Sequence, residues 1–354
     1  MGGSQYQAKL LIDRLCELGT HEVYYLTRSI DPEFSPRGYQ ILRIGTVKGV
    51  GRYGHFVDTF RLLKSLREID PDVIYQMVGC AYTGIAAFYS KRSGCRLVWR
   101  VTSDKSVVKG KTTFGNLLPH RFLEQKLLEY GIRRADDIVI QTRQQSDLLQ
   151  KSYNRVPTAL IRNCHPFPKS IDMKKGRIKV VWIANLKKLK QPELFVRLAS
   201  DLSEFEDVQF VMVGGQADSK KWCSRIVKEI DKQKNLSYVG VKSQKYVNSL
   251  MDESHILVNT SLYEGFSNTF IQAWMRKMAV VSLCVNPDGV FEENFLGIHC
   301  EDDYEKLRES VATLIREPGQ IEKIGQRAEK YALETHSLDN LESLIELLTP
   351  KTSG

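Results

Sequence analysis

A lysine and a glutamate, Lys190 and Glu264, each follow a short apolar run, and their types suit chemistry on a phosphorylated sugar. Lys190 stands in the loop after Lys179–Ile183, and Glu264 in the loop after Ile256–Val258. An ammonium neutralises phosphate, and a carboxylate accepts hydrogen bonds from vicinal hydroxyl groups. Apolar runs of this length predict buried parallel strands. Open α/β sheets bind ligands at the carboxyl edge of such strands, where both loops would then lie.

The stretch around Glu264 predicts a strand–loop–helix–strand unit. The predicted helix is Thr269–Met278, and the strand after it is Ala279–Val285. Gly265 lets the main chain approach a ligand closely, and Gln272 lies two helical turns further on roughly the same face. N–H groups at a helix start bind anions well. Those expected to do so here belong to Phe266, Ser267 and Asn268.

The run EGFSNTFIQAW, which begins at Glu264, resembles the donor-site signature of retaining GT-B glycosyltransferases of the family 4 type. In that signature a second glutamate stands where this chain has Gln272. The resemblance implies that Glu264 and the backbone after it hold the donor sugar, and that Gln272 hydrogen-bonds the nucleotide ribose. The run continued through NPDGVFEENFLG is similar to the members that build bacterial exopolysaccharides or cell-surface glycans.

The resemblance extends to other donor-side positions. Lys190 matches a lysine that grips the donor diphosphate. Asn185 occupies the position of the family's arginine. This replacement removes a positive charge and the two parallel N–H donors of a guanidinium group. Lys187 or Lys188 would restore the positive charge. A run of lysines is also typical of a solvated surface, but its place between a strand and a helix start favours phosphate binding. Val241 ends the strand that frames the nucleotide base.

The acceptor side is predicted from the first third of the chain. Gly2 and Gly3 match the family's glycine turn beside the donor diphosphate and the acceptor, although a flexible terminus is the alternative. Ser4, next to this turn, is placed on the acceptor side. Asp104 follows the predicted strand Arg96–Arg100 and would orient an acceptor hydroxyl, or else cap the next helix.

The fold implied by the resemblance is GT-B, an α/β architecture of two Rossmann-like domains facing a central cleft. We predict an N-terminal acceptor-side domain over residues 1–165 and a nucleotide-sugar-binding domain over 166–335. A last helix, within 336–354, would cross back to the first domain. In the family a central strand precedes the glycine turn, so the first domain is expected to lack its first β-strand.

Composition fits a two-domain cytoplasmic protein. A chain of 354 residues is long enough for two cores. Its seven cysteines are odd in number and scattered without metal-ligand spacing, which predicts free thiols in a reducing compartment and no zinc site. Neither a signal peptide nor an apolar run near the ~20 residues of a membrane span is visible. The D-x-D pattern at Asp70–Asp72 contains Pro71 and predicts a turn rather than a metal site.

The net charge of +9 favours anionic partners. Eleven Lys and Arg against three acids lie between Lys91 and Arg134, together with Phe114, Leu117, Leu118, Phe122 and Leu123. The segment Lys105–Lys126 could therefore dock on an anionic membrane surface, or form an ordinary solvated basic face. No nucleic-acid-binding motif accompanies the charge, so nucleic acid is not an expected partner.

The reaction implied is transfer of a sugar from a UDP- or GDP-linked donor to a hydroxyl of a glycan or polyprenyl-linked acceptor, with retained anomeric configuration. Glu264 and Lys190 are the expected catalytic residues, and neither a metal nor any cofactor is expected. Two alternatives stay open. One is a sugar-nucleotide epimerase, although no acid/base set is evident in the first domain. The other is an inactive relative that acts as a binding or scaffold protein, which Asn185 and Gln272 would mark.

Overall fold

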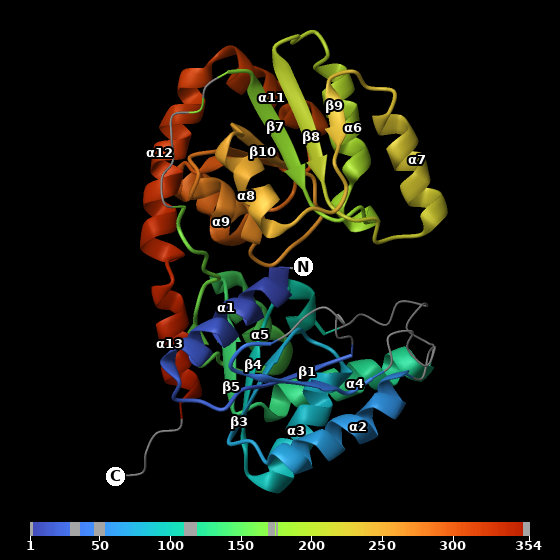
Figure 1. Cartoon of the computed structure of the whole chain (residues 1–354), viewed down its shortest axis with the longest axis vertical. Coiled ribbons are helices and arrows are strands. Elements are labelled where there is room, and N and C mark those ends of the chain that lie inside the picture. The colour runs from blue at the N-terminus through green and yellow to red at the C-terminus, as the bar shows by residue number, and fades with distance from the viewer. Residues whose placement is uncertain are drawn as a thin grey trace. The chain divides into compact units, whose positions relative to one another are not determined.

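The computed structural model describes residues 3–28, 36–45, 54–109, 119–168, 174 and 176–349, except the side chains of 54–57 and 119–120. The chain separates into two compact units. Unit 1 contains Met1–Asn163 and Asp339–Gly354, and unit 2 contains Cys164–Leu338. The two units are described separately below (Figure 1).

Unit 2 is built on one parallel sheet of six strands in the order β12-β11-β10-β7-β8-β9. Its strands are β7 (Ile178–Ile183), β8 (Val208–Val213), β9 (Leu236–Tyr238), β10 (Ile256–Asn259), β11 (Ala279–Ser282) and β12 (Gly297–His299). In register, Ile256 of β10 lies opposite Val180 of β7 on one side and Ala279 of β11 on the other. Because all these strands are parallel, their carboxyl ends lie at one edge of the sheet.

Helices cover both faces of this sheet, which explains the nearly continuous apolar runs of its central strands. The helices of unit 2 are α6 (Pro192–Asp201), α7 (Lys220–Ile230), α8 (Gln244–Asp252), α9 (Asn268–Trp274), α10 (Val290–Asn294), α11 (Tyr304–Arg316) and α12 (Pro318–Thr335). Val180 and Trp182 of β7 face the core under α6, α7 and α11. Val181, between them, faces the core under α8, α9 and α10, and α12 contributes to both cores. Figure 1 shows these layers.

The described strands of unit 1 form two parallel sheets, β1-β2 and β3-β4-β5-β6. The strands are β1 (Tyr24–Thr27), β2 (Gln40–Arg43), β3 (Val73–Met77), β4 (Arg96–Arg100), β5 (Asp137–Ile140) and β6 (Ala159–Leu160). Leu26 of β1 and Ile74 of β3 pack against one core that also holds Leu62, Leu66 and Ile85. The two sheets therefore share a hydrophobic core, although no strand pairing joins them among the described residues.

The end of the chain belongs to unit 1. The helices of this unit are α1 (Gly3–Leu18), α2 (Gly54–Ile69), α3 (Ala81–Ser93), α4 (Pro119–Arg134), α5 (Arg143–Tyr153) and α13 (Asp339–Leu348). Arg14 of α1 pairs with Glu342 of α13 at 2.6 Å, and Arg96 of β4 donates to the carbonyl of Leu347 at 2.7 Å. Helix α13 thus packs beside α1 (Figure 1). None of the helices within the described ranges is long and apolar enough to cross a membrane.

Two glycines let α3 and α4 cross in backbone contact. A Cβ on Gly84 would lie 2.2 Å from the carbonyl oxygen of Leu127, and one on Gly131 would lie 2.6 Å from the backbone of Thr83. Only glycine permits so close an approach of two main chains.

Gly84→Ala is therefore expected to lower the free energy of unfolding by about 1–3 kcal/mol, because the helices must separate to accept the methyl group. Urea denaturation of the purified variant measures this. Gly319→Ala is the matched control, since this helical position has open space around it. Equal stability of the two variants would contradict the prediction.

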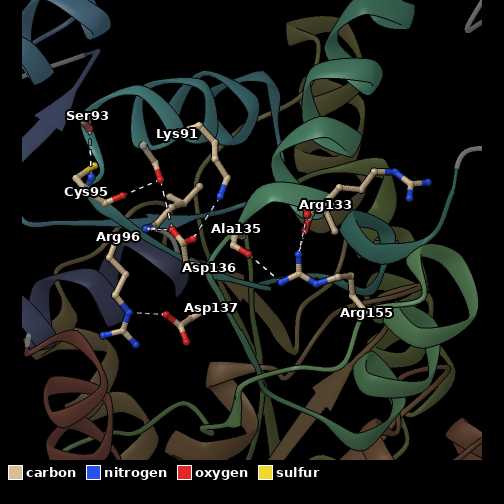
Figure 2. Close-up of polar contacts among 12 residues, drawn as sticks. Lys91, Ser93, Cys95, Arg96, Arg133, Ala135, Asp136, Asp137 and Arg155 are labelled. Carbon is tan, nitrogen blue, oxygen red and sulfur yellow. Dashed lines mark hydrogen bonds and ion pairs between the residues drawn. The ribbon is translucent and has the colours of Figure 1, made fainter. Parts of the chain in front are cut away.

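Figure 2 shows polar contacts that fix β4, β5 and the end of α4. Asp137 of β5 pairs with Arg96 of β4 at 2.6 Å. Arg155 donates to the carbonyls of Arg133 and Ala135, both at 2.8 Å. These carbonyls lie at the carboxyl end of α4, where the last turn leaves acceptors without helical partners. Arg155 therefore holds the end of α4 in place.

Some predicted boundaries in unit 2 were wrong. Helix α9 ends at Trp274 rather than Met278, and Lys277 adopts a left-handed conformation with φ 53°. Strand β11 ends at Ser282 rather than Val285, because the Ser282 hydroxyl donates to the Val285 carbonyl at 2.6 Å and closes a turn.

Candidate functional site

Most of the predicted donor-site residues gather at the carboxyl edge of the unit 2 sheet. The strands whose ends carry them are β10, β7 and β9, and β8 lies between β7 and β9 in the sheet. Asn185 and Lys190 follow β7, Val241 follows β9, and Glu264 follows β10. Residues far apart in the sequence therefore share one edge of a parallel sheet, the position where such sheets bind ligands.

Glu264 and Lys190 form an ion pair. The Lys190 Nζ lies 2.9 Å from the Glu264 Oε1, and the two side chains are only 21% and 16% exposed. Glu264 Oε1 also accepts hydrogen bonds from Asn259 Nδ2 at 2.9 Å and from Ser261 Oγ at 2.7 Å. Asn259 in turn accepts from the Ser261 backbone N–H at 3.0 Å. The carboxylate is thus held in one orientation by three donors.

Asn259 and Ser261 were not predicted as site residues, although the polar run after Ile256–Val258 was visible. That run indicated a loop, and it gave no sign that two of its side chains turn back toward Glu264. Among the described residues, every hydrogen bond and ion pair to Glu264 goes to Oε1. Oε2 is therefore the oxygen that can receive hydrogen bonds from a ligand hydroxyl.

The electrostatic environment keeps Glu264 ionised. Burial raises the pKa of this carboxyl, but the Lys190 ammonium and the hydrogen bonds from Lys190, Asn259 and Ser261 together outweigh burial. The pKa consequently lies below the usual value of a glutamate. The site presents a carboxylate and an ammonium side by side at neutral pH.

Asn185 has a role that the sequence did not indicate. Its Oδ1 accepts a hydrogen bond from the Gly215 backbone N–H at 2.9 Å. A Cβ on Gly215 would lie 2.9 Å from Val241 Cγ2 and 3.3 Å from Asn185 Oδ1, so Asn185 and Val241 lie against the same glycine. The Val241 side chain is 74% exposed. The structure therefore brings both predicted residues together beside Gly215, and the Asn185 side chain holds the backbone there.

The side chains that follow Glu264 are mostly internal. Phe266 is buried, and its ring packs against His336 and Trp274 at centroid distances of 4.7 and 5.9 Å. Ser267 is buried and its hydroxyl lies 2.9 Å from the Thr269 hydroxyl. The Phe266 and Ser267 side chains therefore pack inside unit 2.

Gln272 lies in the middle of α9 and is 6% exposed. Its carbonyl accepts from Arg276 at 3.2 Å, and Arg276 pairs with Asp252 at 2.7 Å. Helix α9 is thereby attached to α8, the helix that contains Asp252. These contacts involve the backbone of Gln272 and do not assign a partner to its side-chain amide.

Asn268, the remaining predicted residue of this loop, is hydrogen-bonded by its side chain to His165. His165 is 3% exposed, and burial is the main cause that lowers its pKa to about 3, with a smaller contribution from Arg276. His165 is therefore neutral in folded unit 2 and positions Asn268.

Folding stability is expected to fall as the pH drops below about 6.5, the usual pKa of a histidine, because unfolded His165 then binds a proton that the folded form does not bind until about pH 3. His165→Gln removes this contribution, so its stability should depend less on pH between about 6.5 and 4. Urea denaturation at stepped pH measures both slopes. Identical slopes would contradict a buried neutral His165.

The predicted acceptor-side residues belong to unit 1. Gly3 and Ser4 are the first residues of α1, while Gly2 lies outside the described residues. Asp104 begins a 3-10 helix, η2 (Asp104–Val107), and its Oδ1 accepts from Gln145 at 3.0 Å. Within the described ranges, no three His, Cys, Asp or Glu side chains gather as a metal site would require.

Residues 166–331, within unit 2, match the family model of Glycosyl transferases group 1. A comparison with curated protein sequences finds no match.

Solved glycosyltransferase structures share the fold over nearly the whole chain. WaaG, a glycosyltransferase involved in lipopolysaccharide biosynthesis, is similar with a TM-score of 0.80 at 14% identity, over 99% of this chain and 97% of that one. Sucrose-phosphate synthase from Thermosynechococcus elongatus is similar with a TM-score of 0.79 at 14% identity, over 98% of this chain and 92% of that one. Anabaena HepE in complex with UDP and glucose is similar with a TM-score of 0.73 at 12% identity, over 98% of this chain and 95% of that one. The predicted α/β GT-B fold is confirmed, and the chain is an enzyme of the glycosyltransferase type.

Proposed function

We propose that this enzyme is a retaining glycosyltransferase of the family 4 type, which moves a sugar from a nucleotide-diphosphate donor to a hydroxyl of a glycan or polyprenyl-linked acceptor in polysaccharide biosynthesis. The observation that carries the proposal is the Lys190–Glu264 ion pair at the carboxyl edge of the unit 2 sheet. It lies inside the residues that match Glycosyl transferases group 1. The structural likeness to WaaG, an enzyme of lipopolysaccharide biosynthesis, supports the class of pathway.

The ion pair suits the charges of this reaction. As the bond between the sugar and the diphosphate breaks, negative charge grows on the phosphate and positive charge on the sugar ring. Lys190 stabilises the departing diphosphate, and preorganised donors of this kind typically contribute ~3–4 kcal/mol each. Glu264 Oε2 accepts hydrogen bonds from the sugar hydroxyls and orients the ring. The acceptor hydroxyl then attacks the anomeric carbon, and its proton passes to the departing phosphate.

The remaining predicted residues receive supporting roles in this proposal. The backbone of Gly265 and the N–H groups of Phe266, Ser267 and Asn268 contact the diphosphate and the sugar. Gln272 hydrogen-bonds the ribose, and Asn185 and Val241 lie beside the nucleotide. Gly3 contacts the donor diphosphate, and Ser4 and Asp104 position the acceptor.

The donor nucleotide is tested by ligand-induced stabilisation. A ligand that binds only the folded protein raises the melting temperature, so a thermal-shift series of UDP, GDP and ADP identifies the base. The complexes of HepE with UDP and with UDP-glucose favour UDP. Sugar transfer is then assayed with the matching nucleotide sugars, with and without EDTA. Since Lys190 supplies the cationic charge, we expect activity to survive EDTA, and its loss would show that a metal is needed.

Two outcomes would replace the proposal. If no nucleoside diphosphate shifts the melting temperature, the chain is better described as a binding or scaffold protein. If incubation of a sugar nucleotide without acceptor gives an epimer rather than slow hydrolysis, the enzyme is an epimerase. Proton NMR of the transferred sugar distinguishes retention from inversion.

The acceptor is proposed to lie at an anionic membrane surface in the cytoplasm, contacted by Lys105–Lys126 and the rest of α4. The exposed side of α4 alternates aromatic and basic residues. Phe122 is 53% exposed with Lys126 Nζ 5.5 Å from its ring centroid, and Tyr130 is 37% exposed with Arg134 at 6.0 Å. Aromatic rings beside cations are typical of interfacial helices. Lys111, Phe114, Leu117 and Leu118 lie outside the described residues.

Liposome sedimentation tests this surface. Each Lys or Arg near an anionic bilayer adds ~1 kcal/mol, so the protein should sediment with phosphatidylglycerol vesicles and not with phosphatidylcholine vesicles. Phe122→Ser together with Lys126→Ser should weaken sedimentation. Lys228→Ser, a change on α7 of unit 2, is the control. Equal partitioning onto both vesicle types would remove the membrane proposal.

A further inference from the structure

A buried hydroxyl joins the loop that carries Lys190 to the strand that leads to Glu264. Thr260 comes directly after β10, and its side chain is fully buried. Its Oγ1 donates to the backbone carbonyl of Lys190 at 2.6 Å and accepts from Trp182 Nε1 at 2.9 Å. Trp182 belongs to β7 and is 1% exposed. The bond to Trp182 is therefore buried, and the bond to the Lys190 carbonyl is partly buried.

The direction of these two bonds is fixed by chemistry. An indole N–H can only donate, so the Thr260 oxygen must accept from Trp182. The single hydroxyl proton of Thr260 is then directed at the Lys190 carbonyl. The two bonds therefore favour one arrangement, because a buried N–H that loses its partner is costly.

A second hydrogen bond joins the Lys190 loop to the residues that follow β10. Lys190 ends a short 3-10 helix, η4 (Lys188–Lys190), and the next residue, Gln191, is in the left-handed region with φ 43°. The backbone N–H of Leu262 donates to the Leu189 carbonyl at 3.0 Å, beside the Thr260 bond. These two bonds set the position of the Lys190 backbone relative to the loop that carries Glu264.

We propose that Thr260 is a positioning residue for glycosyl transfer, which acts through Lys190 by fixing its main chain against β10. Trp182 orients the Thr260 hydroxyl, and the hydroxyl holds the lysine where its ammonium meets both Glu264 and the departing diphosphate. Among the described residues, no hydrogen bond joins the Thr260 side chain to Glu264. The inference rests on the proposed function of the Lys190–Glu264 pair and names the residue that aligns that pair.

Thr260→Val tests the proposal, because valine keeps the branched shape and removes the hydroxyl. The expected result is a fall in kcat of at least about tenfold, since small misplacements of a reacting group are costly. The acceptor KM should not change. Thr260→Ser keeps the hydroxyl and should stay within about twofold of the wild type. A wild-type kcat for Thr260→Val would overturn the proposal.

A double-mutant cycle separates positioning from general destabilisation. If Thr260 acts through Lys190, Thr260→Val should lower kcat much less in a Lys190→Ala background than in the wild type. Equal losses in both backgrounds would overturn the proposal. Should Thr260→Val fail to fold, Trp182→Phe replaces it, because it removes the indole donor and keeps an aromatic ring. Trp182→Phe should likewise lower kcat less in the Lys190→Ala background than in the wild type. Equal losses of kcat in the two backgrounds would overturn the proposal.

UDP binding by titration calorimetry supplies a readout that does not depend on turnover. Thr260→Val should weaken UDP binding, and Thr260→Ser should not. If the wild type binds UDP but transfers no sugar, the proposed function fails, and the binding data alone decide the role of Thr260. Unchanged UDP affinity of Thr260→Val would then overturn that role.

Discussion

Glu264→Gln is expected to reduce turnover of the sugar donor by at least about tenfold, and up to about a thousandfold if the carboxylate stabilises charge on the ring in the transition state. Glutamine keeps the size of the side chain and can still accept at its oxygen from Asn259 and Ser261. The glutamine side chain lacks the negative charge that attracts Lys190, and its amide oxygen is a weaker hydrogen-bond acceptor for the sugar hydroxyls than a carboxylate. The effect should therefore appear mainly in kcat.

Initial rates of transfer and of donor hydrolysis measure this effect, alongside the melting temperature. Glu309→Gln is the control, because Glu309 is 73% exposed on α11 and pairs only distantly with Arg308, at 3.7 Å. Near-normal turnover of a folded Glu264→Gln protein would remove Glu264 from the catalytic site.

Lys190→Met is expected to lower turnover at least about tenfold and to weaken UDP binding, since methionine fills the same space without the charge. The change also alters Glu264. Burial is the largest influence on this carboxyl and raises its pKa, and in the variant only the Asn259 and Ser261 hydrogen bonds oppose it. The pKa of Glu264 should therefore rise.

This rise gives Lys190→Met a distinct pH profile. Its residual activity should fall as the pH decreases toward the raised pKa, over a range in which wild-type activity is still level. Lys228→Met is the control, because Lys228 is an exposed lysine of α7, outside the loop that carries Lys190. Parallel pH profiles of Lys190→Met and the wild type would show that the lysine does not govern the ionisation of Glu264.

The sequence predicted the elements whose signals are local. Ile256–Val258 is an unbroken apolar run, and it lies in β10, which extends one residue further to Asn259. Arg96–Arg100 likewise is β4. By contrast, the short strand β2 (Gln40–Arg43) contains two polar residues and was not predicted, and neither was α8, a helix of nine residues. Short elements take their stability from packing, which a linear pattern does not record.

Site residues also differ in whether the sequence alone could predict them. Glu264 and Lys190 could be singled out because each follows a strand, and the structure brings them together. The Trp182–Thr260 bond joins residues 78 positions apart, and the Asn185–Gly215 bond joins residues 30 apart. No local pattern marks such pairs, because both bonds depend on how β7, β8 and β10 are ordered in the sheet.

Helix α13 has a consequence for how the protein forms during synthesis. Unit 2 is one continuous stretch, whereas unit 1 is completed only by the final segment of the chain, whose Leu341, Leu344 and Ile345 are buried. A ribosome releases residues in order, so unit 2 can fold while it emerges, but unit 1 must wait with an unfilled core until α13 has been made. The first half of the polypeptide is thus the last to mature, and during that delay it is the part most exposed to chaperones and proteases.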